Sequence, residues 1–366
     1  MGANGKTLKF HRVPFIHRTV RVCANSTGAF GALRLNYSPK PVSVSGPTLL
    51  DDLRSVRPWL NINEGLLSVH ISHCEDTEDD ERLEVDVAHT SRLCALLEAE
   101  KAMQRSADHG LFQGKGRLGH GADIVVQTGL DLPAHRAILA ARSPVLQDLM
   151  GGSKTIVEDS TISIRYHFRA PKLPRILVTG CHPMTVLLLL EYVYSDDIPA
   201  VWDRRVSIPC GDLFKYSKVD PIQVKAELEI MARMLRLSAL SEALSASVKH
   251  VPSPTIYTDM HNLFHGIPAS LSAVKPDVFL ELADRNVPCH SVILRARCPF
   301  FRNFFDDEDW TVNRWSSNGT ISVDMKHFEW RAMSFALIWL YDGNEADLFE
   351  HLGELAWHLN LFGSQM

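Results

Sequence analysis

The chain has 366 residues, 45% of them hydrophobic and 22% charged, a composition typical of a folded protein with two or three domains. The formal net charge of −5 and the scattered basic residues give no reason to expect binding to nucleic acid. The longest aliphatic run, residues 186–190, is too short to cross a membrane, and the first residues lack the apolar core of a secretory signal. Seven cysteines without a C-x-x-C pair favour reduced thiols, so we expect a cytoplasmic or nuclear protein without metal or other cofactor.

The N-terminal region contains a predicted hairpin. Residues 18–35 alternate between apolar and other residues on both sides of the sequence NSTG, and two such segments about a glycine turn predict paired strands. The pattern resembles one blade fragment of a β-propeller of the regulator-of-chromosome-condensation type. We therefore interpret residues 1–60 as an N-terminal segment that contains such a fragment.

Residues 61–120 form a predicted acidic and helical linker. The acidic run 75–86 is interpreted as a solvated linker, with a surface for a basic partner as the alternative. The spacing of apolar residues over 87–106 predicts a helix. This helix could pack on a dimer mate or on its own domain.

An internal repeat organises the remainder of the chain. Residues 122–150 and 276–305 align with one inserted residue, and both contain an apolar strand-like run, a Pro-x-His sequence and a short helix that ends near proline. Further on, the apolar stripes of 186–194 and 333–341 share their spacing, each after a strand-like segment at 176–178 or 320–325. A third match relates 228–235 to 352–359. The repeat predicts a duplicated unit of the α+β class.

The repeated sequences are recognisable. The D-I/V-x-V/L, P-x-H-x-x-I-L and Y/W-V/L-Y sequences resemble those of the BTB/POZ family. The resemblance implies two tandem BTB/POZ domains, at 121–250 and 275–366, separated by a linker at 251–274, with the second domain lacking its last helix. Tandem copies of this kind are similar to those of the inhibitor of Bruton tyrosine kinase and its fungal relatives.

The two predicted copies differ in length. Residues 151–174 and 201–222 of the first copy have no counterpart in the second. We interpret both as solvated loops, with a partner-binding element in 151–174 as the alternative. The second copy ends where the last helix of the first begins, at about residue 240, so the chain is expected to be part of a longer protein or to offer an open helix face.

The sequence offers little catalytic chemistry. His135 and His290 occupy equivalent positions, and we interpret them as structural histidines near the first helix of each copy. No metal-ligand or nucleophile pattern stands out, so we predict a protein without enzymatic activity. In corepressor-binding members of the family, residues equivalent to Asp123 and Arg136 line a charged pocket, whereas the second copy has Asp277 and Ser291. A purely structural role for both aspartates is the alternative.

The family resemblance also implies a function. BTB domains of this kind commonly recruit substrates to a cullin-3 ubiquitin ligase through the helix pair, the following loop and the tyrosine-bearing helix. The predicted protein-binding residues are Ile156, Glu158, Tyr194, Phe304, Phe305, Asp307, Trp310 and Tyr341. The expected partners are a cullin-3-type scaffold, another BTB domain within or between chains, and an unidentified protein substrate, without nucleic acid or membrane. The alternative is a scaffold that self-associates or binds a corepressor in signalling or transcription.

Overall fold

A computed structural model of the chain describes residues 19–27, 29–34, 48–59, 78–105, 121–168, 173–246, 252–265, 275–306 and 319–343. The chain divides into two compact units, Met1–Val42 and Ser43–Met366.

The small unit contains the predicted hairpin. Strands β1 (Thr19–Ala24) and β2 (Phe30–Arg34) pair in antiparallel fashion. The side chain of Asn25 closes the turn by accepting hydrogen bonds from the amides of Thr27 (3.1 Å) and Ala29 (2.9 Å), as asparagine does in many tight turns. The prediction of a hairpin is confirmed, and the resemblance to a propeller blade stays a prediction.

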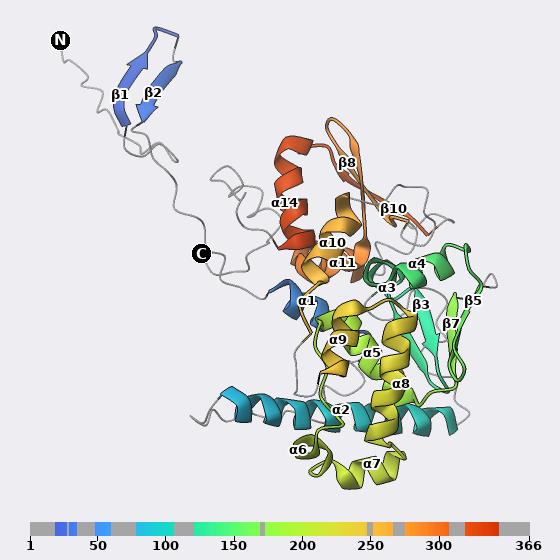
Figure 1. The fold of residues 1–366 in the computed structure, drawn as a ribbon. Coiled ribbons are helices and arrows are strands. Elements are labelled where there is room, and N and C mark those ends of the chain that lie inside the picture. Colours follow the sequence, from blue (N-terminus) through green and yellow to red (C-terminus); the bar gives the residue numbers. More distant parts are fainter. Residues whose placement is uncertain are drawn as a thin grey trace, which may run out of the picture. The chain divides into compact units, whose positions relative to one another are not determined.

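The first half of the large unit is built on a five-stranded sheet in the order β4-β3-β7-β6-β5 (Figure 1). β3 and β7 are parallel and the other neighbours are antiparallel. The strands are β3 (Ile124–Gln127), β4 (Asp131–Ala134), β5 (Ile156–Glu158), β6 (Ser163–His167) and β7 (Arg175–Thr179).

The segment 151–174 is therefore not the solvated loop that we expected. It adds β5 and β6 to the sheet, and Ile162 and Ile164 become buried on one face. The two isoleucines alternate with polar residues, which is the period of a strand with one buried face. Gly180 (φ +86°) follows β7 so close to the carbonyl of Thr161 that any side chain would collide with it.

The helices of the first half surround a central helix, α5, in which every residue from Met184 to Ser195 is buried. α8 packs on α5, and α9 packs on α8. The helices are α3 (Arg136–Arg142), α4 (Pro144–Met150), α5 (Pro183–Ser195), α6 (Arg204–Ser207), α7 (Gly211–Ser217), α8 (Pro221–Met234) and α9 (Ser238–Ser245).

Two further expectations need correction here. Segment 201–222 contains the helices α6 and α7, which bury Val206 and Phe214 and pack on the long helix α2 (Glu78–Arg105). The acidic run is largely the start of α2, where buried Asp86 accepts a hydrogen bond from the amide of Ala200 (3.2 Å). α2 also packs on α5, so it covers its own domain.

The second half of the large unit repeats the first in shorter form. Its three-stranded sheet has the order β10-β8-β9, with β10 and β8 parallel. Its elements are β8 (Val278–Leu282), β9 (Asn286–Cys289), α11 (Ser291–Arg297), α12 (Pro299–Asp306), β10 (Ile321–Met325) and α14 (Trp330–Asp342). The predicted third match, at 352–359, lies outside the described residues.

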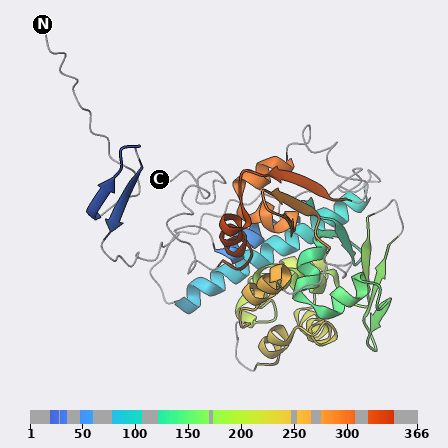
Figure 2. The ribbon, with the colours of Figure 1, turned by 90° about the horizontal axis from the view of Figure 1, so that it is seen from above.

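Two helices that the sequence analysis missed join the halves. α1 (Leu49–Ser55) packs on α5 of the first half and α11 of the second, and α10 (Ile256–His265) packs on α14 of the second and α3 of the first. The large unit therefore includes residues that we had assigned to the N-terminal segment 1–60 and to the linker 251–274. In Figure 2 the second half, orange to red, lies against the first.

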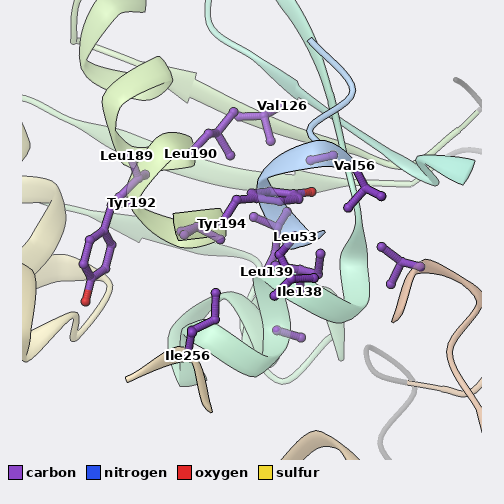
Figure 3. Close-up of a cluster of buried hydrophobic side chains, with 14 of the residues drawn as sticks. Leu53, Val56, Val126, Ile138, Leu139, Leu189, Leu190, Tyr192, Tyr194 and Ile256 are labelled. Atoms are coloured by element: carbon purple, nitrogen blue, oxygen red, sulfur yellow. The ribbon is translucent and has the colours of Figure 1, made fainter. Parts of the chain in front are cut away.

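The two halves share one hydrophobic core. Leu53 of α1, Leu139 of α3, Tyr194 of α5 and Ile256 of α10 lie in a single cluster (Figure 3). A repeat that we overlooked explains why: residues 47–56 (PTLLDDLRSV) and 254–263 (PTIYTDMHNL) carry apolar residues at the same positions. Each helix buries this stripe between the halves.

Candidate protein-interaction site

Both halves contain the same hydrogen-bonded group, at the start of α3 in the first half and of α11 in the second. The amide of His135 donates to the hydroxyl of Tyr194 (2.9 Å), and its Nδ1 lies 2.8 Å from the same oxygen. His290 and Tyr341 repeat the pair at 2.8 and 3.0 Å. Burial raises the pKa of both tyrosine hydroxyls, which stay neutral. The histidines thus have the structural role that we inferred.

The two aspartates at the strand starts are bound by the residue that follows each histidine. Asp123 accepts hydrogen bonds from the amide (2.8 Å) and Nε (2.9 Å) of Arg136. Asp277 accepts them from the amide (2.7 Å) and hydroxyl (2.6 Å) of Ser291. Both carboxylates thus accept hydrogen bonds from the first residue of the following helix, an arginine in the first half and a serine in the second.

A small cavity of about 30 Å³ lies between these two groups. Asp123 and Arg136 line it from the first half, and Lys275 and Asp277 line it from the second. Burial by itself would lower the pKa of Arg136, but the charge and hydrogen bond of Asp123, with smaller contributions from Tyr166 and Asp277, outweigh burial and raise that pKa. The cavity lies at Asp123 and Arg136, the two residues for which the sequence analysis predicted a charged pocket, but both halves line it. Its role in binding a partner stays a prediction.

A buried arginine of the first half binds the linking helix of the second. Arg142 forms ion pairs with Asp196 at the end of α5 and with Asp259 of α10. Its guanidinium also donates to the hydroxyl of Thr255 (2.5 Å) and lies 5.1 Å from the ring centre of Tyr192.

The equivalent arginine of the second half makes the reciprocal contact. Arg297 Nε lies 3.4 Å from the carboxylate of Asp52 in α1, and the guanidinium lies 4.2 Å from the ring centre of Trp339. Arg142 and Arg297 are at matched positions of the two halves. Each arginine stacks on an aromatic ring of its own half and binds the first helix of the other half, which is α10 for Arg142 and α1 for Arg297.

The comparison with known proteins agrees with this geometry. Residues 117–214 match the family model of the BTB/POZ domain. The chain contains a BTB/POZ domain. Over 359 residues the chain is 24% identical to BTB/POZ domain-containing protein 1 of Schizosaccharomyces pombe, an alignment that covers 96% of this chain and 24% of that protein. The chain thus spans about a quarter of the length of this relative.

Three of the predicted partner contacts are wrong, because their side chains lie in the core. Tyr194 of the BTB/POZ domain and Tyr341 of the second half are buried and bound to the histidines. Phe305 is 5% exposed, stacks on Phe301 and lies under the guanidinium of Arg295. Apolar periodicity identifies the inward face of a helix as readily as an interaction face, so the sequence did not separate the two.

The other predicted contacts are on the surface or outside the described residues. Ile156 is half-buried and Glu158 is exposed, both in the edge strand β5 of the BTB/POZ domain. Phe304 is partly buried on α12, stacked on Phe300, which is 38% exposed. Asp307 and Trp310 lie outside the described residues.

Other kinds of site were sought in the described part of the chain. No cluster of three or more histidine, cysteine or acidic side chains there could hold a metal ion. Among the same residues, no helix has the length and apolar character needed to cross a membrane. The cysteines within these ranges are all free thiols.

Proposed function

We propose that the chain is a non-enzymatic interaction adaptor of the cytoplasm or nucleus, built from two paired BTB/POZ domains, and that it serves a cullin-3-type ubiquitin ligase. The proposal of a second domain, at 275–343, is supported by the repeated bonding of His290 and Tyr341, by the equivalent aspartate, and by the stacking of Arg297 on Trp339.

The two domains would be partners of each other. α1 and α10 cross between the halves, and their apolar stripes fill the space between α5 and α11 and between α14 and α3. A face that could otherwise accept another BTB domain is thereby occupied within the chain. Partners of the adaptor would then bind to the outer surfaces.

The observation that carries the ligase proposal is the edge strand β5. It follows α4 and presents a half-buried apolar side chain, Ile156, with an exposed carboxylate, Glu158, two residues further on. An apolar anchor beside a charged group is an effective arrangement for binding a protein, since a few such residues supply most of the binding energy. In the second half, Phe300 and Phe304 on α12 are the alternative anchor.

The test is a binding titration of the full chain with the purified N-terminal domain of cullin-3. We expect sub-micromolar binding that weakens at least about tenfold when Ile156→Ala and Glu158→Ala are combined, the loss typical of a removed hot spot. The matched variant, Phe300→Ser with Phe304→Ser, probes the second half in the same way. Absence of binding by the folded wild-type chain, or full binding by both variants, contradicts the proposal.

A second candidate function rests on the cavity at Asp123 and Arg136. A scaffold that binds a corepressor-like peptide would use this charged cavity, and Arg136→Ala would then abolish peptide capture without changing cullin binding. In either function the substrate or cargo is proposed to bind elsewhere in a longer protein, since the chain spans about a quarter of the relative's length.

A further inference from the structure

The N-terminus of α10 is capped by a residue of the other half. Asp196 ends α5 in the left-handed conformation (φ 54°). One of its carboxylate oxygens accepts hydrogen bonds from the amides of Thr255 and Ile256, both at 2.8 Å. The other oxygen binds Arg142. Asp196 therefore neutralises Arg142 and satisfies two amides at the start of a helix that belongs to the second half.

The equivalent helix α1 caps itself. The carboxylate of Asp51 accepts hydrogen bonds from the amide (3.0 Å) and hydroxyl (2.7 Å) of Thr48, and the Thr48 hydroxyl accepts one from the amide of Asp51 (3.2 Å). This reciprocal arrangement is a capping box. In the aligned repeat, α10 has Thr258 where α1 has Asp51, so α10 has no carboxylate of its own at this position.

The residues that end α5 and α14 also differ between the two halves. α14 ends at Gly343 (φ 70°), the position that Asp196 occupies in α5. A Cβ at Gly343 would lie 3.7 Å from the Cβ of Leu49, the first residue of α1, and 3.6 Å from Nη1 of Arg297. The self-capped helix α1 thus meets a glycine, and the helix α10, which has Thr258 in place of Asp51, meets the carboxylate of Asp196.

We propose that this complementarity makes the two halves select each other rather than a second copy of themselves. The inference rests on the pairing of two BTB/POZ domains proposed above. In a pairing of two first halves, the start of α1 with Asp51 and Asp52 would meet Asp196, placing three carboxylates around one arginine. In a pairing of two second halves, the start of α10 would meet Gly343, and the amides of Thr255 and Ile256 would lose their acceptor.

The physical basis is a combination of attraction and exclusion. Specific interfaces combine favourable contacts with the intended partner and repulsion toward the alternative. Here the favourable contact is the bonding of Asp196 to the helix start, and the repulsion comes from Asp51. The first half therefore binds a helix that begins with threonine and has no acidic residue three positions later.

The test uses the full chain and compares the effect of Thr258→Asp on the melting temperature in two backgrounds, the wild type and Asp196→Gly. We expect opposite signs. Asp196→Gly installs the second half's residue at a backbone conformation that glycine adopts without strain. We expect the amides at 255 and 256 to exchange hydrogen about 10- to 150-fold faster, the factor that corresponds to the about 1.5–3 kcal/mol of a hydrogen bond to a charged group. Thr258→Asp should lower the melting temperature of the wild type, because its carboxylate faces Asp196. The same substitution should raise the melting temperature of the Asp196→Gly chain, because it restores a capping box.

Asp220→Gly serves as the control, and Asp196→Asn replaces Asp196→Gly if that variant does not fold. Asp220 caps α8 within the first half, bonding to the amides of Ile222 (3.0 Å) and Gln223 (3.4 Å). In the Asp220→Gly chain, Thr258→Asp should still lower the melting temperature. If Asp196→Gly does not fold, Asp196→Asn retains an acceptor without the charge, and Thr258→Asp should then cease to be destabilising.

The outcomes separate this inference from the ligase proposal. An effect of Thr258→Asp with the same sign in the wild-type chain and in the Asp196→Gly chain would overturn the inference. Cullin binding by the same variants is an independent readout, because Ile156 and Glu158 lie on β5, away from these helix ends in the sequence and in the sheet order. If the sign of the Thr258→Asp effect reverses as expected but the folded wild-type chain does not bind cullin, the ligase proposal alone is refuted.

Discussion

Replacement of Arg57 offers the sharpest test of how α1 is held to the first half. The carboxylate of Glu191, in the middle of α5, is completely buried. It binds the guanidinium of Arg57, the indole Nε1 of Trp59 (2.8 Å) and the imidazole Nε2 of His89 (3.1 Å). Burial, followed by the positive charge of Arg57, lowers the pKa of His89 to about 3. At neutral pH, Arg57 is therefore the cation that balances Glu191.

The magnitude follows from this arrangement. Arg57→Met leaves a fully buried carboxylate with two neutral donors, and breaking a buried ion pair from one side costs about 3–5 kcal/mol. Adding Glu191→Gln to Arg57→Met removes the unbalanced charge while keeping an acceptor for Trp59. The double variant should therefore be more stable than Arg57→Met alone. The penalty of Arg57→Met should also shrink as the pH falls, because loss of the Arg57 charge raises the pKa of His89 and protonated His89 then balances Glu191.

Urea unfolding of the full chain, followed by far-ultraviolet circular dichroism, measures these free energies. Arg54, at the end of α1 and three residues before Arg57, provides a matched control, since it lies 3.6 Å from Asp197 in a half-exposed pair. Arg54→Met should cost less than about 1 kcal/mol, as is usual for surface ion pairs. The reasoning fails if Arg57→Met also costs less than about 1 kcal/mol, or if Glu191→Gln destabilises the Arg57→Met chain further.

Two other predictions concern the duplicated groups and the pH dependence of stability. Tyr194→Phe and Tyr341→Phe should each lower the free energy of unfolding by about 1–3 kcal/mol, because each leaves a buried histidine amide without its acceptor. Urea unfolding measures both changes. If either substitution leaves the free energy of unfolding unchanged, the two histidine–tyrosine pairs are not equivalent. Burial raises the pKa of Asp52 from 3.8 to about 6, against the opposing effect of Arg297. Asp52 therefore favours the folded state below pH 4, and this contribution, at most about 3 kcal/mol, is lost as the pH rises through 6. The stability difference between wild type and Asp52→Asn, measured from pH 4 to pH 7, should fall by up to this amount; a difference that does not change with pH would refute the assignment.

The sequence was most informative where local pattern and repetition coincide. The hairpin at 18–35, the strands at 176–178 and 320–325 and the apolar stripes of α5 and α14 were predicted because period-two and helical patterns are properties of short segments. The family resemblance also placed Asp123 and Arg136 at one charged pocket, and the two side chains are hydrogen-bonded. The expected loops at 151–174 and 201–222 were wrong because short strands and helices such as β5 and α6 become stable only on a neighbouring sheet or helix.

What the sequence by itself determined is the α+β class, the BTB/POZ character of residues 117–214 and a sequence pattern that recurs at 276–305. Only the tertiary structure decided which side chains face outward and which elements join the halves. Tyr194, Phe305 and Tyr341 have the residue types of an interaction surface, yet all three are buried. Segments distant in the sequence contact the two tyrosines, and Phe305 packs on Phe301 and Arg295. The contacts of α1 and α10 with the opposite halves depend on residues more than a hundred positions apart, as for Arg142 and Asp259. Local patterns carry no information about such contacts, because burial is a property of everything that packs around a side chain.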